Sequence, residues 1–306
     1  MLDRAGALEN SRTMLDGLLR CTECDAGIVV GDEEAVCAGE EHRFPVVEGI
    51  PVMVDEQVLA ADAQYGRQRK YFDAEFAGYT RYRLENWRLS YLERLRSAGL
   101  LGRGEAPVLD VGVGGSGYTV IEAAREGRTA VGCDLSLEGL VTARRFAAAE
   151  DVADRTLWVC CSAEKLPFAP AAFGSALAIA VIEHVPDDQA ALSELARVLE
   201  PGGRAWATVP HALRNISVVF RPPNRRHDQR LGHLRRYEAD ELVEAGGRVG
   251  LIAEEVHFTG HPIKVLQVAA ARLGDRVWWW CERRDLARSH VRRGSMQLSV
   301  TFRRAE

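Results

Sequence analysis

The sequence has no long uninterrupted hydrophobic run. No window of its 306 residues approaches the roughly 20 apolar residues that a membrane-spanning helix needs. The opening stretch, MLDRAGALENSRTMLDGLLR, also lacks the apolar core of a secretory signal peptide. We therefore expect a cytoplasmic protein without a transmembrane segment.

Lysine is scarce, and the chain has no basic surplus. Three lysines stand against 36 arginines among the 39 basic residues, and 44 acidic residues bring the net charge to −5. This balance lacks the general positive charge that attracts nucleic acids. Hydrophobic residues make up 47% and charged residues 27% of the chain, a composition typical of a globular protein with a substantial core.

Cysteine is limited to seven residues, and four potential metal ligands gather near the N-terminus. Cys21-Thr-Glu-Cys24 is followed, after twelve residues, by Cys37-Ala-Gly-Glu-Glu-His42. Zn²⁺ binds four such ligands tetrahedrally, and the metal would supply folding energy that so short a segment lacks. The wide second spacing departs from a pair of Cys-x-x-Cys motifs, so free cysteines in a flexible leader are the alternative. We predict a zinc-ribbon-like module over residues 1–58.

Residues 59–102 change in character. Aromatic and apolar residues recur there at helical spacing between charged ones, for example at Tyr71, Phe76, Tyr82 and Tyr91. The pattern predicts helices. They either pack on the following domain or form a lid over its active site.

A strand-and-helix alternation begins near Ala106. The apolar run Pro107-Val-Leu-Asp-Val leads into a glycine-rich turn over residues 112–117. Glycine allows the sharp turn and lets a ligand approach the backbone closely. A second strand ends at Asp134, whose carboxylate can accept both ribose hydroxyls of an adenosine, in a dinucleotide or in another cofactor. Asp110, two residues before the first glycine, is unusual for a dinucleotide fold.

The later segments distinguish between these cofactors. Leu109-Asp-Val-Gly-Val-Gly, Gly132-Cys-Asp-Leu-Ser, Ala163-Glu-Lys-Leu-Pro-Phe, Ile182-Glu-His-Val and Arg197-Val-Leu-Glu-Pro-Gly-Gly resemble the successive motifs of class I S-adenosylmethionine-dependent methyltransferases. The resemblance spans about residues 108–210. It is greatest to the type 11 branch, which includes ubiquinone-biosynthesis enzymes.

This resemblance implies an α/β fold over residues 103–306, with a seven-stranded Rossmann-like sheet and an insertion at about 211–238. Five parallel strands are expected near Val108, Ala130, Trp158, Ala176 and Ala205. Segments 251–258 and 295–302 would complete the sheet, the last strand antiparallel. Residues 42–54 resemble the end of a Trm112-like zinc ribbon, which implies a structural zinc ion held by Cys21, Cys24, Cys37 and His42.

The resemblance also assigns cofactor contacts. Asp110, Gly112, Gly114 and Gly117 would hold the methionine part of S-adenosylmethionine. Asp134 would bind the ribose, and the adenine would meet Leu135, Ser162 and Ala163. The chain departs from the family at Ser162, where an aspartate is usual, and at Phe173-Gly174, where Phe-Asp is usual.

At the acceptor end, three histidines are candidates for a general base near neutral pH: His233, which we prefer, His184 and His211. Each can instead have a structural role. Arginines crowd residues 214–236 and indicate either recognition of an anionic acceptor or a solvated loop. Trp278-Trp279-Trp280 indicates core packing, a homodimer interface, or contact with a hydrophobic acceptor or a membrane surface.

We therefore predict a methyltransferase of a small-molecule acceptor, with O-methylation favoured, in specialised, lipid or glycan metabolism. The alternative is an rRNA or tRNA base methyltransferase, because one rRNA family joins a similar zinc module to this domain. That family lacks the Glu-His-Val segment, and the acidic net charge argues against nucleic acid. A second alternative is a non-catalytic partner protein that docks through its zinc ribbon.

Overall fold

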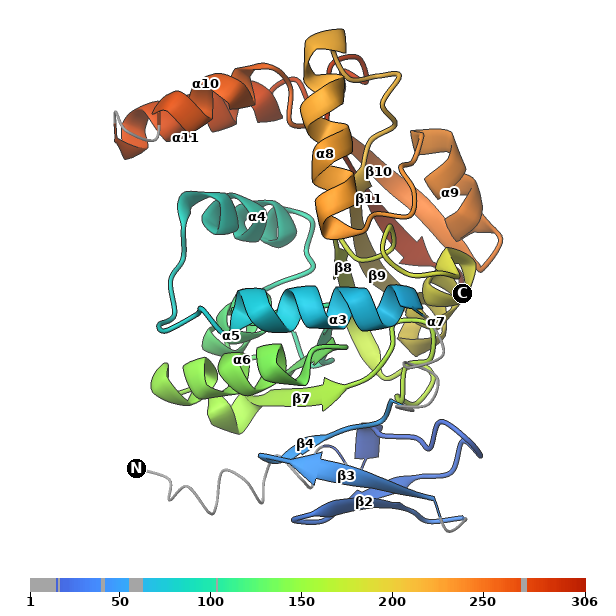
Figure 1. Cartoon of the computed structure of the whole chain (residues 1–306). Helices are drawn as coiled ribbons and strands as arrows, with labels where there is room; N and C mark the ends of the chain where they lie inside the picture. The colour runs from blue at the N-terminus through green and yellow to red at the C-terminus, as the bar shows by residue number, and fades with distance from the viewer. Residues whose placement is uncertain (1–14, 16, 40–41, 55–62, 103, 271–273) are drawn as a thin grey trace.

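The computed structural model describes the chain except residues 1–14, 16, 40–41, 55–62, 103 and 271–273. Within these described residues, no helix is both long and apolar enough to cross a membrane. Figure 1 shows a small sheet at one end of the molecule, a large sheet at its centre, and helices packed around the large sheet.

The N-terminal module is a four-stranded antiparallel sheet in the order β1-β2-β3-β4. Its strands are β1 (Ile28–Val30), β2 (Glu34–Cys37), β3 (Arg43–Val47) and β4 (Ile50–Pro51). Glu48 and Gly49 join β3 to β4, and both have positive φ, at 48° and 73°. Two such residues make the tight hairpin whose twist matches the flanking strands.

Two helices follow the module, as the aromatic spacing predicts. They are α3 (Ala63–Phe76) and α4 (Asn86–Ser97). α3 packs on α6 (Leu137–Ala149), and α4 packs on α11 (Asp275–Leu286). Figure 1 shows α3 running across the front of the large sheet.

The large sheet has seven strands in the order β10-β11-β9-β8-β5-β6-β7. The strands are β5 (Val108–Val111), β6 (Ala130–Asp134), β7 (Thr156–Cys160), β8 (Phe173–Ile179), β9 (Leu199–Pro210), β10 (Leu251–Thr259) and β11 (Gln297–Arg304). β5 to β9 pair in parallel, whereas β11 is antiparallel to both β9 and β10. The predicted seven-stranded sheet with an antiparallel last strand is confirmed.

Helices cover both faces of this sheet. They include α5 (Tyr118–Arg125), α6, α7 (Asp188–Val198) and α9 (Ala239–Gly247), with a 3₁₀ turn η1 (Ala153–Arg155) before β7. β5 is buried along its whole length because both of its faces are covered. Strands of this kind read as continuous apolar runs, which explains why Pro107-Val-Leu-Asp-Val indicates a strand despite its lack of alternation.

Two additions extend beyond the common sheet. The first contains η2 (Val218–Phe220) and α8 (Arg221–Leu231), and it lies within the predicted insertion. The second is a helical hairpin of α10 (Ile263–Ala270) and α11 between β10 and β11. Figure 1 shows α8 and this hairpin on the side of the sheet where α4 lies. The sequence pattern indicates an apolar stretch there but not a hairpin.

Candidate active site

A cavity of about 800 Å³ opens where the parallel strands end. Its walls come from the carboxyl ends of β5, β6, β8 and β9 and from α3, α4 and α8. Ligands of open α/β sheets bind at this edge. The cavity joins residues predicted for the cofactor to two of the three candidate bases, so one space can hold a cofactor and an acceptor together.

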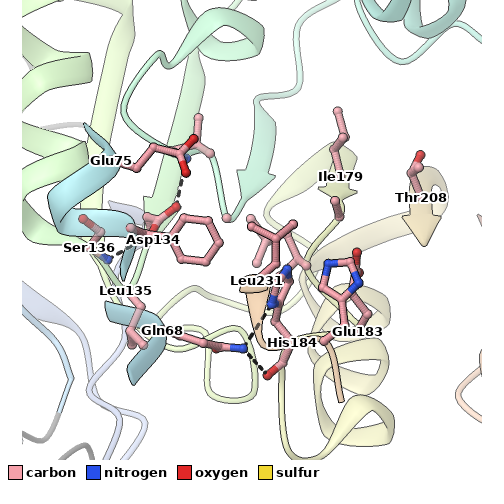
Figure 2. A pocket seen from close by; sticks show the side chains of 18 of the residues that line it. Gln68, Glu75, Asp134, Leu135, Ser136, Ile179, Glu183, His184, Thr208 and Leu231 are labelled. Atoms are coloured by element: carbon pink, nitrogen blue, oxygen red, sulfur yellow. Dashed lines mark hydrogen bonds between the residues drawn. The ribbon is translucent and has the colours of Figure 1, made fainter. Parts of the chain in front are cut away.

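Asp134 stands at the end of β6, as predicted, and lines the cavity. Its carboxylate accepts hydrogen bonds from the backbone N–H groups of Gly114 and Ser136, each at 2.8 Å. Figure 2 shows Asp134 beside Ser136, with the bond between them drawn. Burial raises the pKa of Asp134 despite these bonds. The residue therefore ties the glycine turn to the start of α6, besides offering oxygens to a ligand.

The glycine turn is needed for close packing. Gly112 has a φ of 70°, and a Cβ there would lie 2.4 Å from the Val181 side chain. Gly112 and Gly114 line the cavity, as expected of residues that touch a cofactor. Gly117 does not line it and packs instead on Trp158, whose ring would lie 2.7 Å from a Cβ at this position. Gly117 thus serves the packing of the turn rather than the cavity wall.

Asp110 is buried at the end of β5 with one carboxylate oxygen engaged. Oδ2 accepts a hydrogen bond from the Thr119 hydroxyl, whereas Oδ1 has no partner in the described part of the chain. Burial raises the pKa of Asp110 to about 7, and the nearby Asp134 adds to the increase. A buried oxygen without a partner is costly unless a ligand supplies a donor.

Two further buried polar atoms lack partners among the described residues, and the sequence patterns do not single them out. They are Arg88 Nε and the Tyr118 hydroxyl, and both residues line the cavity. The Arg88 guanidinium carbon lies 4.7 Å from the ring centre of Trp87 and 5.6 Å from that of Tyr118. Arg88 Nη1 is already paired with Glu85, so Nε and the Tyr118 hydroxyl are the buried donors left for a ligand in the cavity.

The predicted adenine contacts also line the cavity. Leu135, Ser162 and Ala163 all belong to its wall. Ser162 Oγ lies 3.3 Å from the Tyr65 hydroxyl of α3, within hydrogen-bonding distance. The same oxygen accepts a 3.2 Å hydrogen bond from the Glu164 N–H, so the Ser162 hydroxyl is held on the cavity wall where the adenine is predicted.

At the acceptor end, His233 is held by a carboxylate. Its Nδ1 lies 2.8 Å from Asp228 Oδ1, and Arg236 donates two hydrogen bonds of 2.8 Å to the same carboxylate. A carboxylate can only accept, so Nδ1 carries the hydrogen and Nε2 is left able to take a proton. Burial lowers the pKa of His233, and Asp228 opposes that decrease. The histidine is therefore neutral at pH 7.

Glu183 and His184 complete this end of the cavity. Ligand-type atoms of Glu183, His184 and His233 all lie within 4.8 Å of one another. Burial raises the pKa of Glu183 to about 8 and lowers that of His184 to about 3, so neither carries a charge at neutral pH. Figure 2 shows Gln68 of α3 bonded to His184 at Nδ1 and at the carbonyl oxygen, each at 3.0 Å.

His211 lies elsewhere. It is fully buried after β9 and does not line the cavity. Its Nδ1 lies 2.6 Å from Ser295 Oγ, and its Nε2 lies 2.9 Å from the Asn215 amide. His211 thus lies apart from the other two candidates, and both of its ring nitrogens lie within hydrogen-bonding distance of other side chains.

α3 covers the cavity from one end to the other. Near the glycine turn, Phe76 lies so close that a Cβ on Gly115 would be 2.7 Å from it. In the middle, Asp73 accepts a hydrogen bond from the Ser136 hydroxyl. At the acceptor end, Gln68 contacts His184 and the carbonyl oxygen of Gly232. This is the position that the predicted lid requires.

The arginines of the insertion differ in where their side chains lie. Arg230 and Arg236 line the cavity, whereas Arg214 pairs with Glu238 and Arg235 pairs with Asp188 outside it. The tryptophans lie on α11, where Trp280 is half exposed and stacks with Arg284. None of the three tryptophans lines the cavity.

The four predicted metal ligands of the N-terminal module meet in space. Atoms of Cys21, Cys24, Cys37 and His42 that can bind a metal lie within 4.8 Å of one another. The sulfur atoms of Cys24 and Cys37 are 3.2 Å apart, and Cys21 Sγ is 3.5 Å from His42 Nδ1. Three thiols and one imidazole form the closed donor set of a structural Zn²⁺ site. The residues fit the ion, and zinc itself stays a prediction.

Comparison with known proteins agrees with this geometry. A methyltransferase domain family matches residues 109–207, from β5 into β9. The chain contains a class I S-adenosylmethionine-dependent methyltransferase domain. This finding confirms the family predicted from the motifs.

The similarity to curated relatives covers only part of each protein. A ubiquinone biosynthesis O-methyltransferase of Klebsiella pneumoniae is 33% identical over 141 residues, which cover 45% of this chain and 54% of that protein. The methyltransferase GfsG of Streptomyces halstedii is 37% identical over 97 residues, covering 32% and 35%. The chain thus spans about half the length of the first of these relatives.

Solved structures share the fold of this chain at low identity. Phosphoethanolamine N-methyltransferase 2 of Haemonchus contortus superposes with a TM-score of 0.55 at 19% identity, covering 86% of this chain and 62% of that one. Geranyl diphosphate C-methyltransferase of Streptomyces coelicolor does so with a TM-score of 0.55 at 16% identity, covering 80% and 99%. Such likeness shows the fold and does not indicate which atom is methylated.

Proposed function

We propose that this protein transfers a methyl group from S-adenosylmethionine to a hydroxyl group of a small molecule. The observation that carries the proposal is the single cavity that joins the Asp110–Asp134 end to the His233–Asp228 pair. Methyl transfer requires the acceptor oxygen, the methyl carbon and the sulfonium to be in line, and a continuous cavity can provide that alignment.

The cofactor would lie along the ends of β5 and β6. The ammonium of its methionine part would meet Asp110 Oδ1, and its carboxylate would meet Arg88 Nε and the Tyr118 hydroxyl. These three buried atoms lack other partners among the described residues, so a zwitterion would satisfy all of them. Asp134 would accept the ribose hydroxyls, and Ser162 would face the adenine edge.

His233 would act as the general base. Its neutral imidazole can accept the hydroxyl proton at Nε2, and Asp228 stabilises the imidazolium that forms. His184 is less suited to this role because burial holds its pKa at about 3. A hydroxyl acceptor needs a base to take up its proton, whereas an amine or an acidic carbon depends much less on one. The pair therefore favours O-methylation, in agreement with the curated ubiquinone-biosynthesis relatives.

α3 would act as a lid. Because it contacts both ends of the cavity, its displacement would open the cavity to the cofactor, and its return would exclude water from the reacting atoms. The N-terminal cysteine and histidine cluster would hold one structural zinc ion, which would stabilise the small sheet.

The test is a direct search for methylated product. The purified protein is incubated with S-adenosylmethionine and a panel of phenols, catechols, hydroxy acids and matched amines, and products are identified by mass spectrometry. The proposal predicts a methyl ether from a hydroxyl compound. Product only from the amines would contradict the assignment of oxygen, and release of no product from any class would favour the non-catalytic alternative.

A further inference from the structure

The N-terminal module holds one end of a segment that lines the cofactor end of the cavity. We call residues 160–168 the adenine wall, because they include the predicted adenine contacts. Val52, just after β4, forms a parallel bridge with Cys160, and the Met53 N–H donates a 2.8 Å hydrogen bond to the Cys160 carbonyl. The module therefore adds a short extra strand to the free edge of β7.

A second stretch of the module holds the other end of the adenine wall. Leu19 forms an antiparallel bridge with Phe168, and the Arg20 N–H donates a 3.0 Å hydrogen bond to the Pro167 carbonyl. Leu19 and Phe168 are both fully buried. Two separate stretches of the module thus hold the adenine wall by backbone hydrogen bonds at its start and at its end.

Between these two attachments lie the side chains that face the cofactor end. Cys161, Ser162 and Ala163 line the cavity. Cys160 pairs with Asp134 in the large sheet, and the Cys161 N–H donates a 3.1 Å hydrogen bond to the Asp134 carbonyl. A displacement of the segment beyond this pairing would move Ser162 and Ala163 relative to the Asp134 carboxylate. The position of the adenine wall therefore affects how well the cavity fits an adenine.

The four metal-binding residues connect the two stretches that hold the wall. Cys21 directly follows Arg20, and His42 directly precedes β3, whose hairpin leads to Val52. Cys21 Sγ and His42 Nδ1 lie 3.5 Å apart. A metal ion bound to both residues would join the stretch at one end of the wall to the stretch at the other.

We propose that metal binding by Cys21, Cys24, Cys37 and His42 fixes the adenine wall and thereby raises the affinity for the cofactor. This inference rests on the proposed function. A sheet of so few residues has little core of its own, so loss of the metal would release both attachments. Coupling between two sites commonly changes affinity by about 5- to 150-fold, and it is reciprocal. Bound cofactor therefore tightens metal binding by the same factor.

The full-length protein, loaded with zinc, provides the test. Calorimetry measures the Kd of S-adenosylhomocysteine for the zinc-loaded protein, for protein stripped with EDTA, and for stripped protein to which zinc is restored. We expect stripping to weaken binding by about 5- to 150-fold and zinc to restore it. Hydrogen exchange should rise in residues 156–169 and stay unchanged in β5. An equal Kd in stripped and loaded protein overturns the inference, as does a protein that retains no zinc.

A pair of variants tests the contact without removing the metal. Leu19→Ala shortens a fully buried side chain at the wall, whereas Val29→Ala shortens one that is 58% exposed on the same small sheet. With zinc bound, Leu19→Ala should weaken binding of S-adenosylhomocysteine and raise exchange in the adenine wall, and Val29→Ala should do neither. Equal affinities for both variants would also overturn the inference, even if stripped protein unfolds entirely.

The outcomes separate the two proposals. Zinc-loaded wild-type protein that fails to bind S-adenosylhomocysteine contradicts the proposed function. Wild-type protein that binds it with the same Kd in the presence and absence of zinc contradicts only the coupling.

Discussion

Replacing Arg88 by methionine should weaken binding of S-adenosylhomocysteine and leave binding of methylthioadenosine unchanged. The guanidinium is buried at 7% exposure, and its Nε has no partner in the part of the chain that the structure describes. Methionine keeps much of the length and apolar contact of the side chain but removes the charge. The two ligands share the adenosine and the sulfur, and only the first carries an amino acid end.

The size of the effect follows from the kind of bond that is lost. A hydrogen bond to a charged group contributes about 1.5–3 kcal/mol. Loss of that amount raises the Kd about 10- to 150-fold. Calorimetric titration of both ligands against wild type and variant gives the ratio directly. Methylthioadenosine also serves as the internal control for an intact adenosine end.

A matched control lies on the same helix. Arg94 also stacks on aromatic rings, at 5.0 Å from both Tyr91 and Trp206, but it does not line the cavity. Arg94→Met should therefore leave both ligands bound as in wild type. If Arg88→Met binds S-adenosylhomocysteine as tightly as wild type, the carboxylate does not meet Arg88. If both ligands weaken equally, the residue supports the fold rather than the amino acid end.

Three further outcomes are expected. Asp134→Ala should raise the Kd of methylthioadenosine as well as that of S-adenosylhomocysteine, because the ribose is common to both; unchanged calorimetric affinity would mean that the ribose lies elsewhere. His233→Asn should lower kcat on a hydroxyl acceptor by about 10²- to 10⁴-fold with little change in cofactor Kd. The wild-type rate should reach half of its plateau below pH 6.5, because the pKa of His233 is lowered, and a rate that still rises above pH 8 would exclude this base. Thermal unfolding should show that the cofactor-free protein loses stability between pH 6.5 and 8, since Glu183 keeps its proton in the folded state up to about pH 8 and loses it earlier when unfolded. Glu183→Gln should flatten that slope, and an unchanged slope would show that Glu183 is not its source.

The cofactor end of the site could be predicted from the sequence because its residues follow the strands that position them. Asp110 and Asp134 stand near the ends of continuous apolar runs. The glycines of residues 112–117 allow the sharp turn that follows β5. Local sequence therefore determines their place at the edge of the sheet. Gly117 shows where this reasoning fails, since its contact with Trp158 depends on packing from another strand.

Arg88 and Asp228 could not be found in this way. Arg88 reaches the site from a helix before the first strand, and its side chain lies among aromatic residues whose spacing indicates only a helix. Asp228 acts on His233 from an insertion whose arginines obscure it in the sequence. The contact between the adenine wall and the module joins residues more than 100 positions apart, such as Val52 and Cys160. Such pairings require the tertiary structure.

Calorimetric titration of the purified, zinc-loaded protein with S-adenosylhomocysteine tests the central claim most directly, with NADH as the control ligand. The proposed cofactor site predicts one site per chain with a micromolar Kd for S-adenosylhomocysteine and no heat of binding for NADH. Binding of neither ligand to a folded, zinc-loaded protein would contradict the account, because Asp110, Arg88 and Tyr118 would then have no zwitterion to receive.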